Sequence, residues 1–420
     1  MKRLGYLLTV CLLMVLQSAS AASDASTRTR IFDHSFRSLK VSVENDFMAV
    51  PVIRNGADSH LVVSFDRIAD DVSHLRYRIL HCNAGWQRSG LLESEFVDGF
   101  NLAPVEDYAF SSNTFVHFVN YRIVLPNNDM MPLVSGNYLL QVFPEDDPDK
   151  TLLQARFCVS DEAMAVTGDV LSVTDRGVND RYQQLEIMVD RLGYPVQNPV
   201  TDLIVTVEQN SDPATLRTLP PPMRVDGQRM IFEHQQQLIF DAGNEYRRFE
   251  TVAVPQAGMH VDSTRFIDDR YNVFLQPDRE RTHSYIYDQT QHGRFMIRES
   301  NASDSDLGAD YVNVHFQLNI PEQPGAEVYV QGEMTDAFPQ GASRMVYDPD
   351  VKAYTLTLPL KQGSYNYRYM LRAPGDELPS AAPIEGNHYQ TRNEYTVKVY
   401  HRAPGARGDR LLAVYTLRNY

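Results

Sequence analysis

Four runs of sequence decide the fold: YRILHCNAGW (residues 77–86), LLESEFVDGFN (91–101), VNYRIVLPNND (119–129) and SGNYLLQVF (135–143). Apolar residues alternate with polar ones at the start of this stretch, where Leu75, Tyr77 and Ile79 are separated by Arg76 and Arg78. An alternation of period two predicts β-strands with one face in a core and one face in water. The loops between the strands carry aromatic and amide side chains but no recognisable catalytic group.

The same alternation recurs along the rest of the chain. It is clear in YVNVHFQL (311–318), in YNYRY (365–369) and in EYTVKVY (394–400). No window carries a persuasive helical apolar stripe longer than three turns, and the 23 Pro and 22 Gly residues mostly lie between the runs, where turns belong. The sequence therefore predicts an all-β protein of two to three consecutive immunoglobulin-like β-sandwich domains.

Shifts in composition suggest where these domains begin and end. A first sandwich is predicted over residues 35–161, ending in the strand LLQARFCVS, and a second over residues 165–300. The polar stretch ESNASDSDLG (299–308) has the composition of a linker, so that a third sandwich is predicted over residues 309–420.

Length and charge exclude several classes of function. The chain has 420 residues, 43% of them hydrophobic, which is enough to bury two or three cores. Its formal charge of −15 argues against nucleic acid, because phosphate binding depends on clustered Lys and Arg. The same acidity repels an anionic membrane surface.

The N-terminus has the pattern of an export signal. Lys2 and Arg3 precede an apolar run from Leu4 to Leu16, and Ala19-Ser20-Ala21 supplies small residues for cleavage. We therefore expect a signal peptide over residues 1–22. No later apolar run approaches the ~20 residues that a membrane-spanning helix needs, which predicts a soluble protein outside the cytoplasm without direct membrane insertion.

Cys82 and Cys158 remain after cleavage of this signal. In an oxidising compartment they could form a disulfide that closes a long loop. Alternatively, they are two small buried apolar side chains. Without a CxxC pair they predict neither a zinc site nor a redox motif.

The sequence nominates no catalytic, cofactor-binding or metal-binding residue. HExxH, GxSxG, phosphate-loop and dinucleotide-binding motifs are all missing. His81 and Cys82 are adjacent, but neighbours on a strand point to opposite faces. Asp304, Asp306 and Asp310 lack the Gly and Glu of a calcium loop. We therefore expect no enzyme activity, no cofactor and no small-molecule substrate.

With no catalytic or metal-binding residue nominated, the sequence points to a protein that binds other molecules through its surface. Trp86, the only Trp, is interpreted either as a core residue beneath a strand or as an anchor in an interface. Two loops are further candidates for an interface. The candidate residues are Trp86, Phe100, Asn101, Asn127, Asn128, Asp129, Met130 and Met131.

The opening runs resemble the N-terminal domain of the Bacteroidetes type IX secretion plug proteins. GNEYRRFE (243–250) is similar to a signature of the same family, and the match continues through ADYVNVHFQL (309–318), EGNHYQTRNEYTVKVYHR (385–402) and GARGDRLLAVYTLRN (405–419). The resemblance implies a periplasmic protein that binds the periplasmic mouth of the giant outer-membrane β-barrel translocon and seals it when no substrate passes.

The C-terminal segment supports a different function. VYVQGEMTDAF (328–338) followed by MVYDPDVKAYTLTLPLKQGSYNYRYML (345–371) is similar to glycogen-binding modules. Such modules stack sugars on exposed aromatic side chains, for which Phe338 and the Tyr residues would have to serve. A periplasmic carbohydrate-binding accessory protein is therefore the alternative, and a scaffold for other periplasmic components shares the sequence features of a plug.

Overall fold

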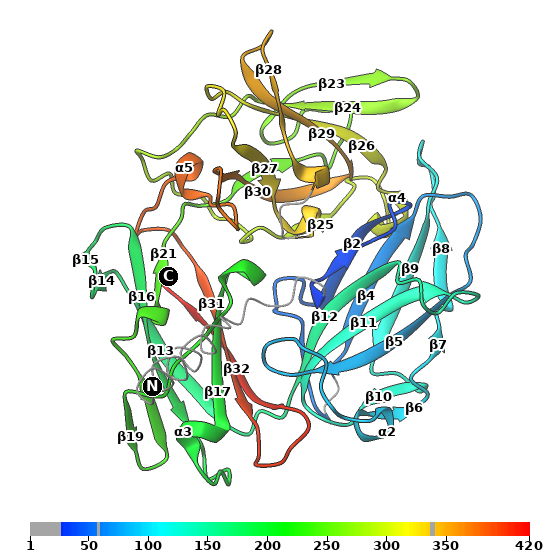
Figure 1. The fold of residues 1–420 in the computed structure, drawn as a ribbon. Coiled ribbons are helices and arrows are strands. Elements are labelled where there is room, and N and C mark those ends of the chain that lie inside the picture. The colour runs from blue at the N-terminus through cyan, green and yellow to red at the C-terminus, as the bar shows by residue number, and fades with distance from the viewer. Residues whose placement is uncertain (1–26, 57–58, 337–340) are drawn as a thin grey trace, which may run out of the picture.

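The computed structural model describes residues 27–56, 59–336 and 341–420. The expected signal peptide and Phe338 therefore lie outside the described residues. Nearly all regular structure is β, and the strands form three packed units arranged around a common centre (Figure 1). None of the helices in the described ranges is long and apolar enough to cross a membrane.

Unit 1, residues 27–161, is a sandwich of two antiparallel sheets with one added parallel strand. Its strands pack around a core that contains Phe65, Ile79 and Tyr121. The first sheet consists of β1 (Arg30–Ile31), β12 (Leu153–Ser160), β11 (Gly136–Pro144), β5 (Leu75–Cys82) and β7 (Ala103–Pro104), with β3 (Val52–Arg54) parallel to β12. The second consists of β2 (Phe36–Val43), β4 (Leu61–Arg67), β9 (Val119–Leu125) and β8 (Asp107–Phe110). A short helix, α2 (Glu93–Phe96), leads into a two-stranded ribbon of β6 (Val97–Gly99) and β10 (Met130–Pro132).

Unit 2 is built from two separate stretches, residues 162–242 and 393–420. One sheet consists of β13 (Ala165–Leu171), β16 (Tyr182–Asp190), β20 (Arg229–Phe232), β19 (Arg224–Asp226) and β21 (Ile239–Asp241). The other consists of β18 (Arg217–Thr218), β17 (Leu203–Gln209), β31 (Glu394–His401) and β32 (Arg410–Arg418). The small elements are the hairpin β14 (Val173–Thr174) with β15 (Gly177–Val178), α3 (Pro199–Asp202), η2 (Pro213–Thr215) and η3 (Gln236–Leu238).

Unit 3 occupies residues 243–392, between the two stretches of unit 2. One layer contains β22 (Arg247–Glu250), β30 (Gly363–Arg372), β25 (Phe295–Ile297) and β27 (Glu327–Gln331). The other is β23 (Val261–Ile267), β24 (Arg270–Leu275), β26 (Tyr311–Leu318), β29 (Ala353–Lys361) and β28 (Val346–Asp348). The short helices are α4 (Ser305–Gly308), η4 (Glu333–Thr335), η5 (Gly341–Ser343) and α5 (Ala382–Glu385).

These pairings differ from the predicted boundaries at 165–300 and 309–420. Residues 394–401 return to pair with Leu203–Gln209, and Arg247–Glu250 pairs with β30. The polar stretch 299–308 lies inside unit 3 and contains α4, so it links strands of one sandwich. The reason is physical: alternation shows that a segment is a strand, whereas its partner depends on long-range packing.

Buried polar contacts join unit 3 to both of the other units. Lys361 of unit 3 lies 2.6 Å from Asp66 of unit 1, and both side chains are only 1% exposed. Arg368 of unit 3 lies 2.6 Å from Asp212 of unit 2. Separating a buried pair leaves an uncompensated charge, which costs several kcal/mol. The units therefore form one stiff body.

Candidate functional site

The two loops predicted to bind a partner meet in the ribbon of β6 and β10. Met130 pairs with Gly99 and Met131 with Asp98, and the Phe100 backbone N–H donates to the Asp129 carbonyl at 3.0 Å. Directly opposed residues share a face, as do residues two apart. Phe100, Met131, Asp98 and Asp129 therefore point to the same side of the ribbon.

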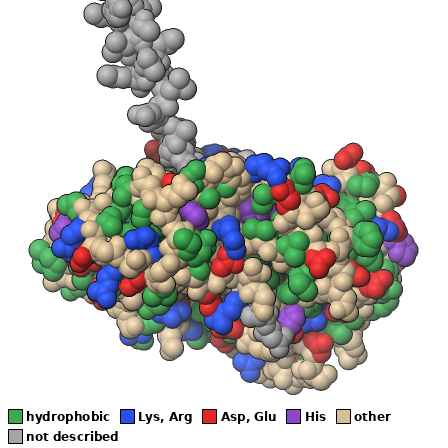
Figure 2. All heavy atoms as spheres, turned by 90° about the horizontal axis from the view of Figure 1, so that it is seen from below, with side chains coloured by type: hydrophobic (Ala, Val, Ile, Leu, Met, Phe, Trp, Pro, Cys, Tyr) green, Lys and Arg blue, Asp and Glu red, His purple; other side chains and the backbone are tan. Residues whose placement is uncertain are grey.

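That side is exposed and apolar. Phe100 is 81% exposed, Met131 49%, and Leu133, two residues further along, 46%. Leu92 and Leu102, in the chain segments on either side of β6, are also exposed. We call these five side chains the apolar face. In the view from below, green hydrophobic and red acidic side chains are interspersed on the right-hand side, under unit 1 (Figure 2).

The opposite side of the ribbon is buried and fixes its position. Val97 and Met130 belong to the core of unit 1, so Met130 is not available to a partner, contrary to the prediction. A two-stranded ribbon is marginal alone, and this burial of one side is what stabilises it. The side chain of Met130 anchors the ribbon, while that of Met131 projects from it.

Two predicted amide residues hold the ribbon rather than extend its exposed face. Asn101 accepts from the Ile79 N–H and donates to the Ile79 carbonyl, both at 2.9 Å, as an added strand would. Asn127 accepts from the N–H groups of Asp129 and Met130 and donates to the Tyr77 hydroxyl at 2.8 Å. Such an Asx turn sets the entry into β10. Asn128 is exposed at its tip.

Trp86 is a core residue, as the first of its two interpretations predicted, and it is not exposed as an interface anchor. It is 4% exposed and lies in a cluster between units 1 and 2 with Leu139, Tyr400 and Leu411. The Arg156 guanidinium lies 4.2 Å from its ring centre. The β31–β32 hairpin covers it, so it contributes to the contact between units within the chain.

Cys82 and Cys158 are both buried free thiols. Each is the register partner of Asn137, on opposite sides of β11. Adjacent strands lie about 4.8 Å apart, so two strand spacings separate the cysteines by nearly 10 Å, beyond the reach of a disulfide. The proposed disulfide is therefore excluded by this register. Burial raises the pKa of the Cys82 thiol to about 12.

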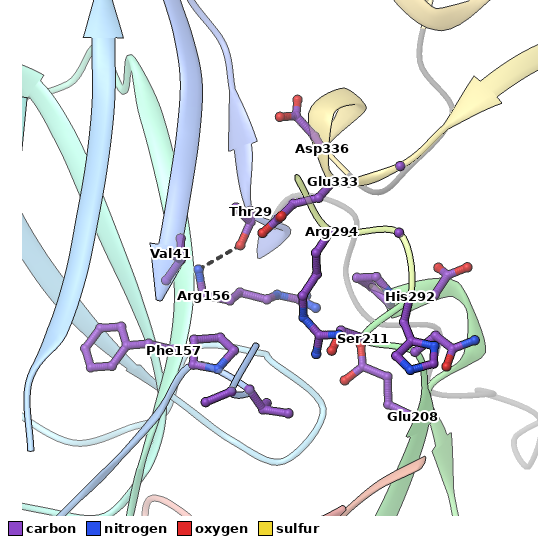
Figure 3. Close-up of a pocket in the computed structure, with 18 of the residues that line it drawn as sticks. Thr29, Val41, Arg156, Phe157, Glu208, Ser211, His292, Arg294, Glu333 and Asp336 are labelled. Atoms are coloured by element: carbon purple, nitrogen blue, oxygen red, sulfur yellow. Dashed lines mark hydrogen bonds between the residues drawn. The ribbon is translucent and has the colours of Figure 1, made fainter. Parts of the chain in front are cut away.

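A cavity of about 150 Å³ lies where the three units meet (Figure 3). Thr29 and Arg156 line it from unit 1, Glu208 from unit 2, and His292 and Arg294 from unit 3. Figure 3 shows Arg294 and Arg156 reaching inward from opposite walls, with the Arg156 backbone N–H bonded to the Thr29 hydroxyl at 3.0 Å.

Two charged residues that line this cavity, Arg294 and Glu333, form ion pairs with residues of another unit. Arg294 lies 3.3 Å from Glu394 of unit 2, and Lys40 of unit 1 pairs with Glu333 of unit 3. Burial lowers the pKa of His292 to about 4, so its imidazole is neutral at pH 7. The cavity is therefore a structural junction between the units. Across the described part of the chain, no three His, Cys, Asp or Glu side chains gather in a way that could hold a metal ion.

Sequence reasoning missed three residues of the apolar face: Leu92, Leu102 and Leu133. Leu92 is the second residue of the run 91–101 that contains Phe100, and Leu102 directly follows that run. Leu133 lies two residues after Met131 and one residue beyond the end of β10. Extending the period-two pattern one step past Met131 could have identified Leu133. Nothing in the sequence alone shows that leucines in such loops are exposed.

The fold defines a β-sandwich protein of three packed units that exposes an apolar face on unit 1. Residues 36–161 match the family model of the type 9 secretion system plug protein 1st domain. The chain is also similar to a hypothetical protein from Parabacteroides merdae ATCC 43184, known from a crystal structure, with 37% identity and a TM-score of 0.91 over 94% of this chain and 99% of that one. The chain belongs to the type IX secretion system plug protein family.

Two further comparisons add nothing to this assignment. A structure of Pseudomonas fluorescens alkylpurine DNA glycosylase AlkC bound to DNA covers 30% of each chain at 11% identity, and its TM-score of 0.16 carries no argument. No curated protein matches the chain.

Proposed function

We propose that this chain is a non-catalytic, periplasmic plug that binds and seals the periplasmic mouth of the giant outer-membrane β-barrel translocon of the type IX secretion system. The match of residues 36–161 to the plug first domain carries the proposal. The N-terminal export pattern supports the periplasmic location.

The architecture supports the mechanical part of this role. The largest outer-membrane barrels reach about 36 strands, and such a lumen leaks unless something occludes it. A plug needs bulk and stiffness more than chemistry. The three units supply both, because buried ion pairs such as Lys361–Asp66 and Arg368–Asp212 join them.

The apolar face supports reversible binding. Its five apolar side chains are interspersed with carboxylates such as Asp98 and Asp129, so the contact surface is mixed in polarity. Obligate interfaces are larger and more apolar than this, whereas separable ones are mixed. A plug must leave the barrel when a substrate passes, which requires an interface of the separable kind.

The geometry of unit 3 argues against carbohydrate binding. Tyr365, Tyr367 and Tyr369 point into the core, each at most 1% exposed. The hydroxyls of Tyr367 and Tyr369 donate to Asp278 at 2.7 and 2.8 Å. Sugar stacking needs exposed ring faces, and these rings have none.

An affinity capture tests the function. The tagged mature protein is purified from gently solubilised envelopes, and its partners are identified by mass spectrometry. We expect one very large outer-membrane barrel, enriched when secretion substrates are absent. Capture of other periplasmic components without the barrel would favour a scaffold, and capture of glycans would favour the carbohydrate-binding alternative.

A second experiment tests sealing itself. The purified barrel is reconstituted in a planar bilayer, and the purified chain is added to one side at a time. We expect the conductance to fall only on addition to the side that corresponds to the periplasm. Bovine serum albumin at equal concentration controls for non-specific block, and unchanged conductance with bound chain would refute sealing while leaving binding intact.

A further inference from the structure

The charged side chains within the two segments that build the apolar face are all acidic. The two segments that build it, residues 92–102 and 126–135, contain Glu93, Glu95, Asp98 and Asp129 but no Lys or Arg. Glu95 pairs with Arg407 of unit 2. Within the described ranges, Glu93, Asp98 and Asp129 are exposed and form no ion pair. An apolar centre is therefore bordered by unneutralised carboxylates.

The backbone beneath this face is fixed before any partner arrives. Met130 and Val97 are buried under it, Asn127 makes four hydrogen bonds, and Asn101 makes two. A preformed surface loses little conformational entropy on binding. Phe100 and Met131 therefore have the exposure and the support expected of anchor residues.

We propose that this face docks into an apolar pocket rimmed by Lys and Arg side chains on the periplasmic side of the barrel. This inference rests on the proposed function and adds the docking face and the chemistry of the partner surface. Charge complementarity is the argument, because Glu93, Asp98 and Asp129 gain most from cations and lose most against carboxylates.

The same charges disfavour two other occupants. A second copy of this chain, bound face to face, would bring Asp98 and Asp129 against their own equivalents, and like charges in contact cost several kcal/mol. An anionic lipid surface would likewise repel them. A basic protein surface with a pocket for Phe100 meets neither objection.

Matched variants test the inference by binding to the detergent-solubilised barrel on a sensor surface. Phe100→Ala with Met131→Ala removes apolar anchors, and Asp98→Lys with Asp129→Lys reverses the border charge. Asp146→Lys with Asp147→Lys is the control, because it makes the same charge change at an exposed turn of the same unit. The four aspartates that these variants replace, Asp98, Asp129, Asp146 and Asp147, are all exposed, so we expect the variants to fold. Circular dichroism checks the fold of each variant.

We expect Phe100→Ala with Met131→Ala to weaken binding at least about 30-fold, the effect of losing one strong anchor. The Asp98→Lys, Asp129→Lys variant should weaken it by about 10-fold or more at low salt and lose most of the salt dependence of the original chain. The control should bind within about 3-fold of the original.

The outcomes separate this inference from the function on which it rests. If the original chain does not bind the barrel, the proposed function fails. If it binds and all three variants bind equally, the plug function stands but this face is not the docking site. If the charge variant binds more tightly, the border of the pocket is acidic and the inference is wrong. Gel filtration that shows dimers broken by the same variants would assign the face to a second copy.

Discussion

The buried pair between Lys361 and Asp66 offers the sharpest test of the contact between units 1 and 3. Asp66 also accepts hydrogen bonds from the Tyr311 hydroxyl and from the Asn120 side chain, both at 2.7 Å. Lys361→Met removes the only cation among these partners and leaves a carboxylate in a site that is 1% exposed. Losing one member of such a pair costs about 3–5 kcal/mol of unfolding free energy.

A double variant separates pair loss from packing loss. Asp66→Asn keeps an acceptor for Tyr311 and removes the charge, so that in combination with Lys361→Met no charge remains unpaired. Replacing a whole buried pair by neutral groups is often tolerated. We therefore expect the double variant to recover more than half of the lost stability. Arg76→Met is the control, because its pair with Glu145 is solvent-exposed and contributes below about 1 kcal/mol.

Urea unfolding measures these effects with two signals. Trp86 fluorescence reports the contact between units 1 and 2, because the chain has no other Trp, and far-ultraviolet circular dichroism reports all strands. Coincident transitions are expected if the three units unfold together. A Lys361→Met cost below about 1 kcal/mol, or a double variant no more stable than the single one, would refute the reasoning.

Three further predictions concern the core and the ribbon. The pKa of the His292 imidazole is about 6.5 in the unfolded chain and about 4 in the folded chain, so the unfolded chain takes up the proton first as the pH falls. The contribution of this group to the free energy of unfolding should therefore be constant above about pH 6.5 and should fall by about 2–3 kcal/mol between pH 6.5 and 4. His292→Asn should flatten that fall when stability is measured by urea unfolding at each pH. Cys82 and Cys158 should resist a thiol reagent at pH 8 in the folded mature protein, whereas both thiols should react in denaturant without a reductant. If neither thiol reacts in denaturant until a reductant is added, the two cysteines form a disulfide. Asn101→Ala leaves both backbone groups of Ile79 without their partner and should cost about 1–3 kcal/mol in thermal unfolding, whereas exposed Asn128→Ala should change it by less than about 0.5 kcal/mol.

The sequence predicted strands far better than their partners. The run that ends in RFCVS is β12 (Leu153–Ser160), and EYTVKVY lies within β31 (Glu394–His401). Both follow from alternation and β-branched residues, which are local properties. That β31 pairs with β17 across nearly the whole of unit 3 is not local, because Val397 and Val399 would fit many sheets equally well.

The candidate interface residues show the same difference between what is local in the sequence and what depends on long-range packing. Phe100 and Met131 were predicted from loop composition, and the structure leaves them exposed on one side of the ribbon. Trp86 was predicted on the same grounds, but Tyr400 and Leu411, more than 300 residues later, cover it. Asn127 stabilises the turn before β10 and does not extend the exposed face. The sequence does not distinguish these roles, because an amide side chain just before a strand can either bond the backbone of a turn or face a partner. Only the three-dimensional packing distinguishes these cases.

The interleaving of units 2 and 3 bears directly on how a plug could be released. Unit 2 cannot complete its second sheet until the chain has passed through unit 3 and returned as β31 and β32. Buried ion pairs join unit 3 to both other units. Separating unit 3 from either of them would therefore break these pairs and leave buried charges unpaired. Under the proposed function, opening the barrel by remodelling the plug would therefore be costly. Displacing the whole body requires only that the contacts of the apolar face be broken, which favours release as a rigid unit.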